Sequence, residues 1–215
     1  MRFFCSWSGG KDSCLALYES IVKGNTPDTL FTVFVGNGER SRAHGLKQNI
    51  IEAQAKSLNI PLEIGTADWG EYESVLIEFL KKMKRNGVEG GVFGDIDLQG
   101  HKDWIDKVCE IADITPMLPL WQRDRVELVN EFIDLGFETM IVSTKSSVMG
   151  KEYLGQILDK KLVNKLQERG IDPSGEGGEF HTLVIDGPIF KERIELNIGE
   201  ISEKEKYYYL DVSLK

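Results

Sequence analysis

The sequence predicts an α/β protein with a parallel sheet covered by helices on both faces, followed by a smaller α+β domain. In the first two-thirds of the 215 residues, short apolar runs alternate with amphipathic segments of helical length. Glycine turns follow two of these runs. Strands separated by helices form right-handed βαβ units, so we expect the strands to run parallel and the helices to cover both faces.

The first part of the chain follows this order closely. Short apolar runs predict strands at residues 3–7, 30–35, 62–66 and 91–94. Apolar residues at helical spacing predict helices from the first glycine turn to about residue 23, at 42–58, at 102–112, and from 72 to a stop at Asn86-Gly87. This order is typical of a Rossmann-like sheet, in which ligands bind beyond the carboxyl ends of the strands.

Two prolines, Pro116 and Pro119, interrupt the alternation. We therefore expect a first domain at 1–118 and a second, substrate-binding domain at 119–215. In the second domain the sequence predicts helices at 125–135 and 160–169 and strands at 138–143, 182–185, 193–196 and 207–212. These elements predict a small α+β fold.

Composition excludes several classes of protein. No stretch approaches the roughly 20 apolar residues of a membrane helix, and no signal peptide is recognised, so we expect a cytoplasmic protein without a membrane partner. The net charge of -9 argues against direct nucleic-acid binding, because phosphate-binding surfaces are basic. Cys5, Cys14 and Cys109 lack C-x-x-C spacing, which favours buried, reduced thiols over disulfides or a zinc site.

The loop between the first strand and the first helix reads Ser8-Gly9-Gly10-Lys11-Asp12-Ser13. Its glycines allow backbone N–H groups to approach an anion, and the helix start adds a favourable dipole. We expect Lys11, at an exposed helix start, and the hydroxyls of Ser8 and Ser13 to contact phosphates. Asp12 suits Mg²⁺ or a backbone cap. The loop matches neither a Walker A nor a dinucleotide motif; the alternative is an ordinary capped turn.

A second dense segment, 172–182, holds carboxylates and a histidine among glycines. Glu176, Glu179 and His181 are expected to line a polar pocket, although a solvated glycine loop is the alternative. Asp95 and Asp97, after the fourth predicted strand, are expected to contact nucleotide or Mg²⁺, unless they are turn residues. His44 is expected to touch the adenine or ribose, with a surface histidine as the alternative.

The loop at 8–13 resembles the PP-loop of the N-type ATP pyrophosphatases, enzymes that split ATP between its α and β phosphates. The whole chain resembles the diphthine–ammonia ligase family (diphthamide synthases). The resemblance rests on G-E-G-G-E-F-H-T at 175–182, on the run at 184–190, and on Gly94-Asp95-Ile96 followed by His101, Trp104 and Pro119-Leu120-Trp121. It spans nearly the full chain, from residue 8 to 190.

The resemblance implies a PP-loop ATPase domain and a C-terminal substrate domain. It implies that ATP and Mg²⁺ adenylate the carboxylate of diphthine on translation elongation factor 2. Ammonia, supplied as ammonium, then forms the amide, with release of AMP and pyrophosphate. We expect the catalytic residues to be Lys11, Glu176, Glu179 and His181, with Glu179 or His181 taking a proton from ammonium.

The trimethylammonium group of diphthine suits acidic or aromatic walls. Candidates for these walls are Glu176, Glu179, Trp69, Trp104 and Trp121, with simple core packing as the alternative for the tryptophans. A homodimer is possible.

Other functions compete with this expectation. A bacterial relative, in a source without diphthamide, would act on another carboxylate. A tRNA thiolase of the same superfamily is disfavoured by the absence of paired cysteines and by the acidic charge. A glutamine-dependent amidotransferase would need an ammonia-generating domain for which the chain has little room. A nucleotide sensor that binds ATP without cleaving it is the alternative outside enzymes.

Overall fold

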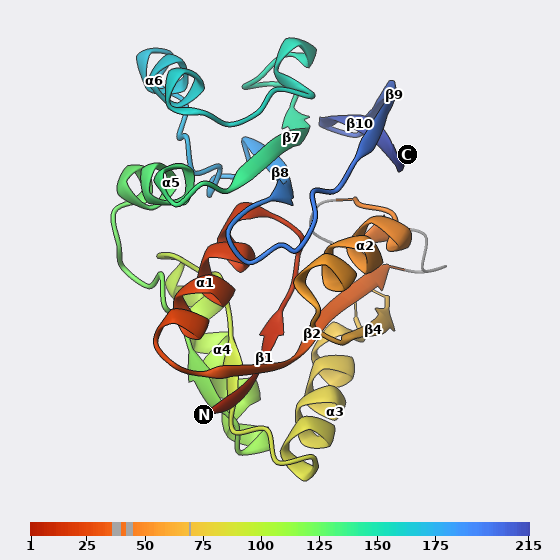
Figure 1. Cartoon of the computed structure of the whole chain (residues 1–215), viewed down its shortest axis with the longest axis vertical. Helices are drawn as coiled ribbons and strands as arrows, with labels where there is room; N and C mark the ends of the chain where they lie inside the picture. The colour runs from red at the N-terminus through yellow and green to blue at the C-terminus, as the bar shows by residue number, and fades with distance from the viewer. Residues whose placement is uncertain (36–39, 42–44, 69) are drawn as a thin grey trace.

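The computed structural model describes residues 1–35, 40–41, 45–68 and 70–215, which form two lobes, each built on a sheet (Figure 1). The first sheet is parallel apart from one short antiparallel strand, and the second is antiparallel. The predicted α/β class, with a smaller α+β part after it, is confirmed. The predicted domain boundary at 118/119 lies between the two sheets and stays a prediction.

The first sheet consists of β1 (Arg2–Ser6), β2 (Thr26–Val35), β3 (Arg40–Ser41), β4 (Leu62–Ala67), β5 (Gly90–Val92) and β6 (Thr115–Met117). β1 lies between β2 and β5, β4 pairs with β2, and β6 pairs with β5, all in parallel, whereas β3 pairs antiparallel with β2. The chain builds the sheet outward from one side of β1 and then from the other. The ligand crevice of such a sheet lies at this reversal, beyond β1 and β5.

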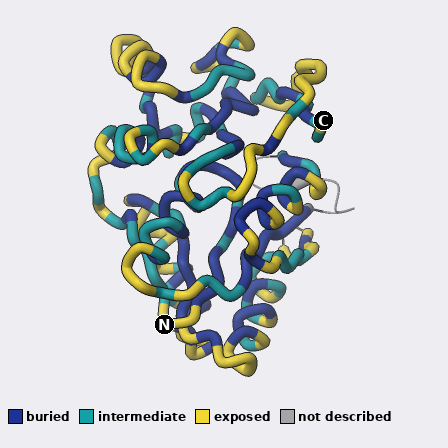
Figure 2. The backbone as a smooth tube through the Cα atoms, viewed as in Figure 1, coloured by how far each residue is buried: buried dark blue, intermediate teal, exposed yellow. Residues whose placement is uncertain are grey.

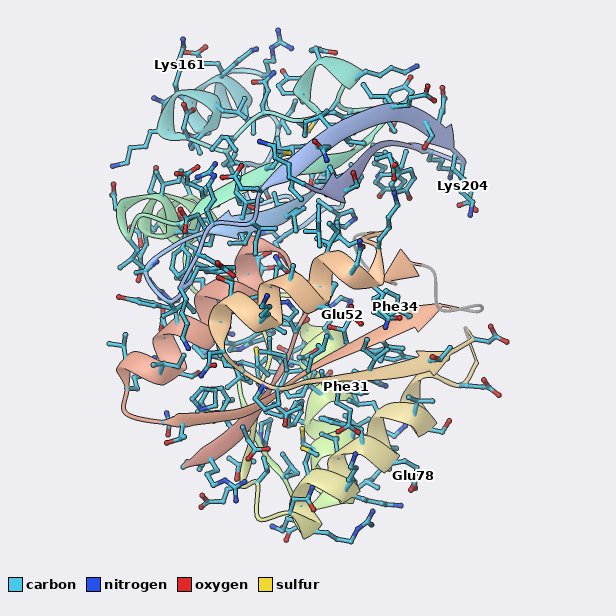
Figure 3. All side chains as sticks on the ribbon, turned by 45° about the vertical axis from the view of Figure 1, so that its right-hand side comes forward. Phe31, Phe34, Glu52, Glu78, Lys161 and Lys204 are labelled. Carbon is cyan, nitrogen blue, oxygen red and sulfur yellow. The ribbon has the colours of Figure 1, made fainter. Side chains whose placement is uncertain are left out.

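Helices cover both faces of the first sheet, as predicted: α1 (Lys11–Val22), α2 (Gln48–Leu58), α3 (Tyr72–Arg85) and α4 (Gln99–Ala112). α1 and α2 pack on one face, and α3 and α4 on the other. Phe34 belongs to the core under α1 and α2, whereas Phe31 belongs to the opposite core and stacks on Phe79 at 3.7 Å between ring centroids. Figure 3 labels both phenylalanines.

The second sheet has the order β8-β7-β10-β9. Its elements are α5 (Arg125–Asp134), β7 (Glu138–Lys145), the short 3-10 helix η1 (Lys151–Tyr153), α6 (Lys160–Glu168), β8 (Phe180–Asp186), β9 (Leu196–Lys204) and β10 (Tyr207–Leu214). α5 and α6 start at the capping residues Asp124 and Asp159, whose carboxylates accept backbone N–H bonds. Figure 2 shows buried backbone through the middle of both lobes and exposed backbone at their outer ends.

Three sequence predictions differ from the structure. Pro116 lies within β6; a missing N–H is tolerated there because β6 is an edge strand. The helix predicted at 42–58 begins at Gln48; Gly45 has a left-handed φ of +66°, and residues 42–44 lie outside the described part. The strand predicted at 193–196 begins only at Leu196 and is longer; β9 is exposed along almost its whole length and so lacks the alternation of a half-buried strand.

The two lobes are joined at the carbonyl of Gly9. This oxygen accepts hydrogen bonds from Val184 N–H of β8 at 2.9 Å and from Gln54 Nε2 of α2 at 3.0 Å. Gln54 is fully buried; its Nε2 also donates to the Val184 carbonyl at 2.7 Å, and its Oε1 accepts from Trp7 Nε1 at 3.0 Å. The same apolar core contains Leu17 of α1 and Leu183 of β8. The second lobe is therefore anchored directly on the glycine loop.

We expect Gln54→Leu to destabilise the protein by roughly 2 to 4 kcal/mol, because Trp7 Nε1 and the Val184 carbonyl lose buried hydrogen bonds. Urea unfolding followed by circular dichroism measures the change. Gln48→Leu is the matched control on the same helix; Gln48 is exposed, and its replacement should change stability by about 0.5 kcal/mol or less. Equal stabilities of the two variants would contradict the proposed role of Gln54 at the junction.

Candidate functional site

A cavity of about 920 Å³ lies at the carboxyl end of the first sheet. Four segments line it: the glycine loop with the start of α1, the middle of β2, the loop after β5, and part of the segment from Ser174 to Thr182 in the second lobe. Tyr72 and Trp104 add a wall from α3 and α4. The cavity lies where the strand order predicts a ligand, and both lobes contribute to it.

The glycine loop has a geometry that its sequence requires. Gly9 has a φ of +82°, and a Cβ atom there would lie 2.8 Å from Gln54 Oε1 and from Ile51 Cδ1. Only glycine combines this left-handed backbone with such close packing. Inside the loop, the hydroxyls of Ser8 and Ser13 lie 3.0 Å apart. The loop is therefore preformed by its own contacts.

α1 begins directly after this loop. Gly10 is its N-cap and supplies no side-chain hydrogen bond, so the first N–H groups of the helix are not capped by that residue. The Lys11 N–H donates to Thr182 Oγ1 of β8 at 3.2 Å. Uncapped N–H groups and the helix dipole favour an anion at this position.

Lys11 is buried, with 5% of its surface exposed, so the expected exposed position at the helix start is wrong. Its Nζ donates to Asp12 Oδ2 at 2.8 Å, and both residues line the cavity. Thr182 and the second lobe cover this end of α1, which explains the burial. Lys11 thus presents a buried positive charge to the cavity that is balanced by Asp12.

The loop after β5 packs tightly on the start of α1. A Cβ atom on Gly94 would lie 2.8 Å from Asp12 C and Ser13 N, so a side chain at this position would clash with backbone. The next residue, Asp95, lines the cavity and forms a 3.0 Å hydrogen bond with His101 Nδ1. Burial raises the pKa of Asp95, an effect that the hydrogen bond with His101 opposes.

Asp97 has a different role from its neighbour Asp95. Arg125 binds it in a bidentate pair, with both N–O distances at 2.7 Å, and this hydrogen bonding lowers the pKa of Asp97. The same guanidinium bonds Asp172 at 2.5 Å, and Asp172 accepts hydrogen bonds from Ser174 N and Oγ at 2.8 Å. Asp97, expected near nucleotide or Mg²⁺, is instead part of an ion-pair clip that holds the 172–176 loop against the first lobe.

Glu176 faces the cavity from this clipped loop. The pKa of Glu176 is raised to about 7, chiefly by burial. The negative charges of Asp12 and Asp95 contribute to this rise, and the positive charges of Lys11 and Arg125 oppose it. Glu176 can therefore hold or release a proton near neutral pH, beside the glycine loop.

The other two residues expected in this segment lie farther along it. His181 lines the cavity, and its ring lies 6.0 Å from that of Tyr207, whose hydroxyl donates to the Gly178 carbonyl at 2.9 Å. The Glu179 side chain lies against Gly177, and its buried Oε2 has no hydrogen-bond partner within the described structure. Glu179 is not among the residues that line the cavity.

The tryptophan candidates divide into different environments. Trp104 lines the cavity, stacks on Tyr72 at 5.6 Å, and donates from Nε1 to Glu73 Oε2 at 2.8 Å. Trp121 does not line it. His44 and Trp69, expected to contact nucleotide and acceptor respectively, lie outside the described residues.

Sequence reasoning missed Gln54, Thr182, Arg125 and the pairing of His101 with Asp95. Gln54 had one signal, as a polar residue on the apolar side of a predicted helix. The contacts of Thr182 and Arg125 join distant segments, whereas His101 and Asp95 are only six residues apart and meet because the loop after β5 turns into α4.

A metal ion has limited support from the protein alone. Within the described ranges, no group of three or more His, Cys, Asp or Glu residues could hold one. Mg²⁺ is commonly bound by one or two carboxylates together with substrate phosphates. Asp12, which lines the cavity at the start of α1, fits that pattern.

None of the helices that the structure describes is long and apolar enough to cross a membrane.

Comparison with known proteins gives consistent results. Family models for the diphthamide synthase N-terminal and C-terminal domains match residues 1–116 and 124–214. A human protein named diphthine--ammonia ligase is 27% identical over 94% of this chain and 85% of its own length. A Schizosaccharomyces pombe protein of the same name is 26% identical over 91% of this chain and 36% of its own.

Among solved structures, one described as a predicted subunit of tRNA methyltransferase from Methanocaldococcus jannaschii has a TM-score of 0.48. It is 19% identical and covers 90% of this chain and 100% of its own.

The pKa of Glu176 predicts a stability effect with a defined sign. Because the folded protein binds the proton more tightly than the unfolded chain, stability should fall as pH rises from about 4.5 to about 7. Glu176→Gln removes this loss and should be more stable than the wild type at pH 8 by up to about 3 kcal/mol. The difference should shrink toward pH 5.

Urea unfolding at pH 5 to 8 measures this difference in stability, with a change at the exposed Glu168 of α6, Glu168→Gln, as the control. A constant difference between Glu176→Gln and the wild type over this range would contradict the raised pKa.

Proposed function

The chain belongs to the diphthamide synthase family, and we propose that this ATP-dependent ligase adenylates a carboxylate and then amidates it with ammonia. The acceptor that we propose is diphthine on translation elongation factor 2, as the names of its relatives suggest. A cytoplasmic location agrees with a substrate of the translation machinery. AMP and pyrophosphate are the proposed leaving products.

One observation carries this proposal. A single cavity contains the phosphate loop of the first lobe and, from the second, Glu176, a carboxyl group that titrates near neutral pH. A simple nucleotide-binding site needs donors for the phosphates and no buried acid beside them. A carboxyl group with a shifted pKa next to such donors is typical of catalytic sites.

The phosphate loop supports binding of ATP at the start of α1. The triphosphate would accept hydrogen bonds from the uncapped N–H groups and from Ser8 and Ser13. Lys11 would exchange its bond with Asp12 for a phosphate oxygen, because a phosphate carries more negative charge. Mg²⁺ held by Asp12 and the phosphates would neutralise charge on the departing pyrophosphate.

The proposed reaction has two steps. An oxygen of the acceptor carboxylate attacks the α-phosphorus, and the bond to the β-phosphate oxygen breaks. Ammonia then attacks the acyl carbon, and the bond to the AMP oxygen breaks. Glu176 in its protonated form would not repel the anionic acceptor or the phosphates, which is consistent with its raised pKa.

We assign the side of the cavity formed by the second lobe to the acceptor. His181 lines it, and Tyr207 supports the His181 ring. Glu179 lies next to this wall and carries a buried carboxylate oxygen without a partner among the described residues. A cationic acceptor group would be attracted to an uncompensated carboxylate and to aromatic rings.

Incubation with ATP, ammonium and diphthine-bearing elongation factor 2 should yield AMP and pyrophosphate in step with the new amide. Nucleotide chromatography and mass spectrometry of the factor measure both. Lys11→Ala should lose most turnover. Lys23→Ala, at the exposed far end of the same helix, is the control and should keep it.

ADP as the main product would contradict the proposed chemistry. Binding of ATP with no cleavage in the presence of the acceptor would favour a sensor instead. Cleavage that does not depend on elongation factor 2 but does depend on another carboxylate would replace the proposed acceptor.

A further inference from the structure

A histidine–aspartate pair faces the cavity from the first lobe. His101, in the first turn of α4, and Asp95, in the loop after β5, both line the cavity and are joined by a 3.0 Å hydrogen bond at Nδ1. We propose that His101, oriented by Asp95, is the base that converts ammonium to ammonia for the amidation step. This inference rests on the proposed function and adds a catalytic residue to it.

The backbone fixes this pair near the phosphate loop. Gly94 packs directly on the backbone of Asp12 and Ser13, so the residue that follows it, Asp95, is held beside the start of α1. Asp95 in turn orients the imidazole of His101. The position therefore depends on the same close contact that shapes the phosphate site.

The geometry also selects the basic nitrogen. When Nδ1–H donates to the Asp95 carboxylate, Nε2 carries the lone pair and can accept a proton. A carboxylate that accepts a hydrogen bond from the other ring nitrogen also stabilises the imidazolium after proton transfer, as in other enzymes in which a carboxylate orients a catalytic histidine. The bond to Asp95 therefore determines which tautomer His101 adopts.

The surrounding charges favour ammonium as a ligand. The carboxylates near the pair are Asp95 itself, Asp12 from α1 and Glu176 from the second lobe, and they are close enough to influence the pKa of one another. Of the cations that act on these carboxylates, Lys11 is paired with Asp12, and Arg125 is paired with Asp97 and Asp172.

On the side of α3, Glu73 is bonded to Lys107 and to Trp104 Nε1. Asp95 and Asp12, with Glu176 whenever it is ionised, would therefore attract a small cation to this side of the cavity.

The proton balance of the step is simple. Ammonium gives one proton to His101 Nε2 and becomes ammonia, whose lone pair forms the new bond to the acyl carbon. The bond from that carbon to the AMP oxygen then breaks. The nitrogen loses a second proton, which passes to the departing AMP or to water. The side chain of His101 is 63% exposed, so the imidazolium can return its proton to solvent before the next turnover.

Two nucleophiles separate this role from a structural one. Ammonium must lose a proton before attack, whereas hydroxylamine is largely unprotonated at neutral pH and needs no base to become nucleophilic. His101→Gln should lower amide formation from ammonium by about 10²- to 10⁴-fold at pH 7. It should leave hydroxamate formation from hydroxylamine, acceptor-dependent ATP–pyrophosphate exchange and the KM for ATP close to the wild-type values.

The pH profile supplies a second readout. Because the share of free ammonia rises with pH, the ammonium-dependent rate of His101→Gln should recover toward that of the wild type as pH increases from 7 to 9. Asp95→Asn should show the same nucleophile selectivity with a smaller loss, since Asn cannot balance the imidazolium charge. Gln99→Ala, a change at an exposed residue two positions before His101 on α4, is the folding control.

Equal losses with ammonium and hydroxylamine, or a loss that does not recover with pH, would overturn the role of His101. Unchanged ammonium-dependent turnover in His101→Gln would also overturn it. These results differ from a failure of the proposed function, in which the wild type itself would form neither amide nor hydroxamate.

Discussion

The carbonyl of Gly9 accepts hydrogen bonds from β8 and from α2, and the geometry of the cavity depends on that junction. It fixes the glycine loop in a left-handed turn and holds the start of α1 against the second lobe. Thr182, two residues before Val184, then reaches the Lys11 N–H. The glycine loop and the 174–182 segment are therefore in direct contact, and the bond between Lys11 and Thr182 joins residues 171 apart in the sequence.

The charge distribution of the cavity follows from this packing. One buried lysine faces Asp12, Asp95 and Glu176, so the site carries more negative than positive groups before a ligand binds. Protonation of Glu176 near neutral pH reduces this imbalance. The burial that destabilises ionised Glu176 is consistent with a site in which stability is lost for function. A ligand that brings a triphosphate would reorganise the pairing of Lys11 and leave the carboxylates to cationic groups.

Local patterns in the sequence predicted the sheet, the glycine loop and the place of the ligand crevice, because each depends on short-range chemistry. Lys11 was placed wrongly, since a helix start is normally exposed and here the distant Thr182 contacts its backbone N–H. Gln54 lies 45 residues from Gly9, and no local pattern links the two. The Arg125 clip and the pKa of Glu176 likewise require three segments to meet. The ion pairs and pKa values of the site therefore depend on tertiary contacts and cannot be predicted from residue types alone.

Amide hydrogen exchange at Val184, followed by nuclear magnetic resonance, tests the junction most directly. If the two lobes form one unit around Gly9, the Val184 N–H should exchange only through global unfolding, as slowly as the buried Ile141 of β7. Exchange as fast as that of exposed Glu200 in the edge strand β9 would show that the lobes separate in solution, and would contradict a cavity built jointly by both.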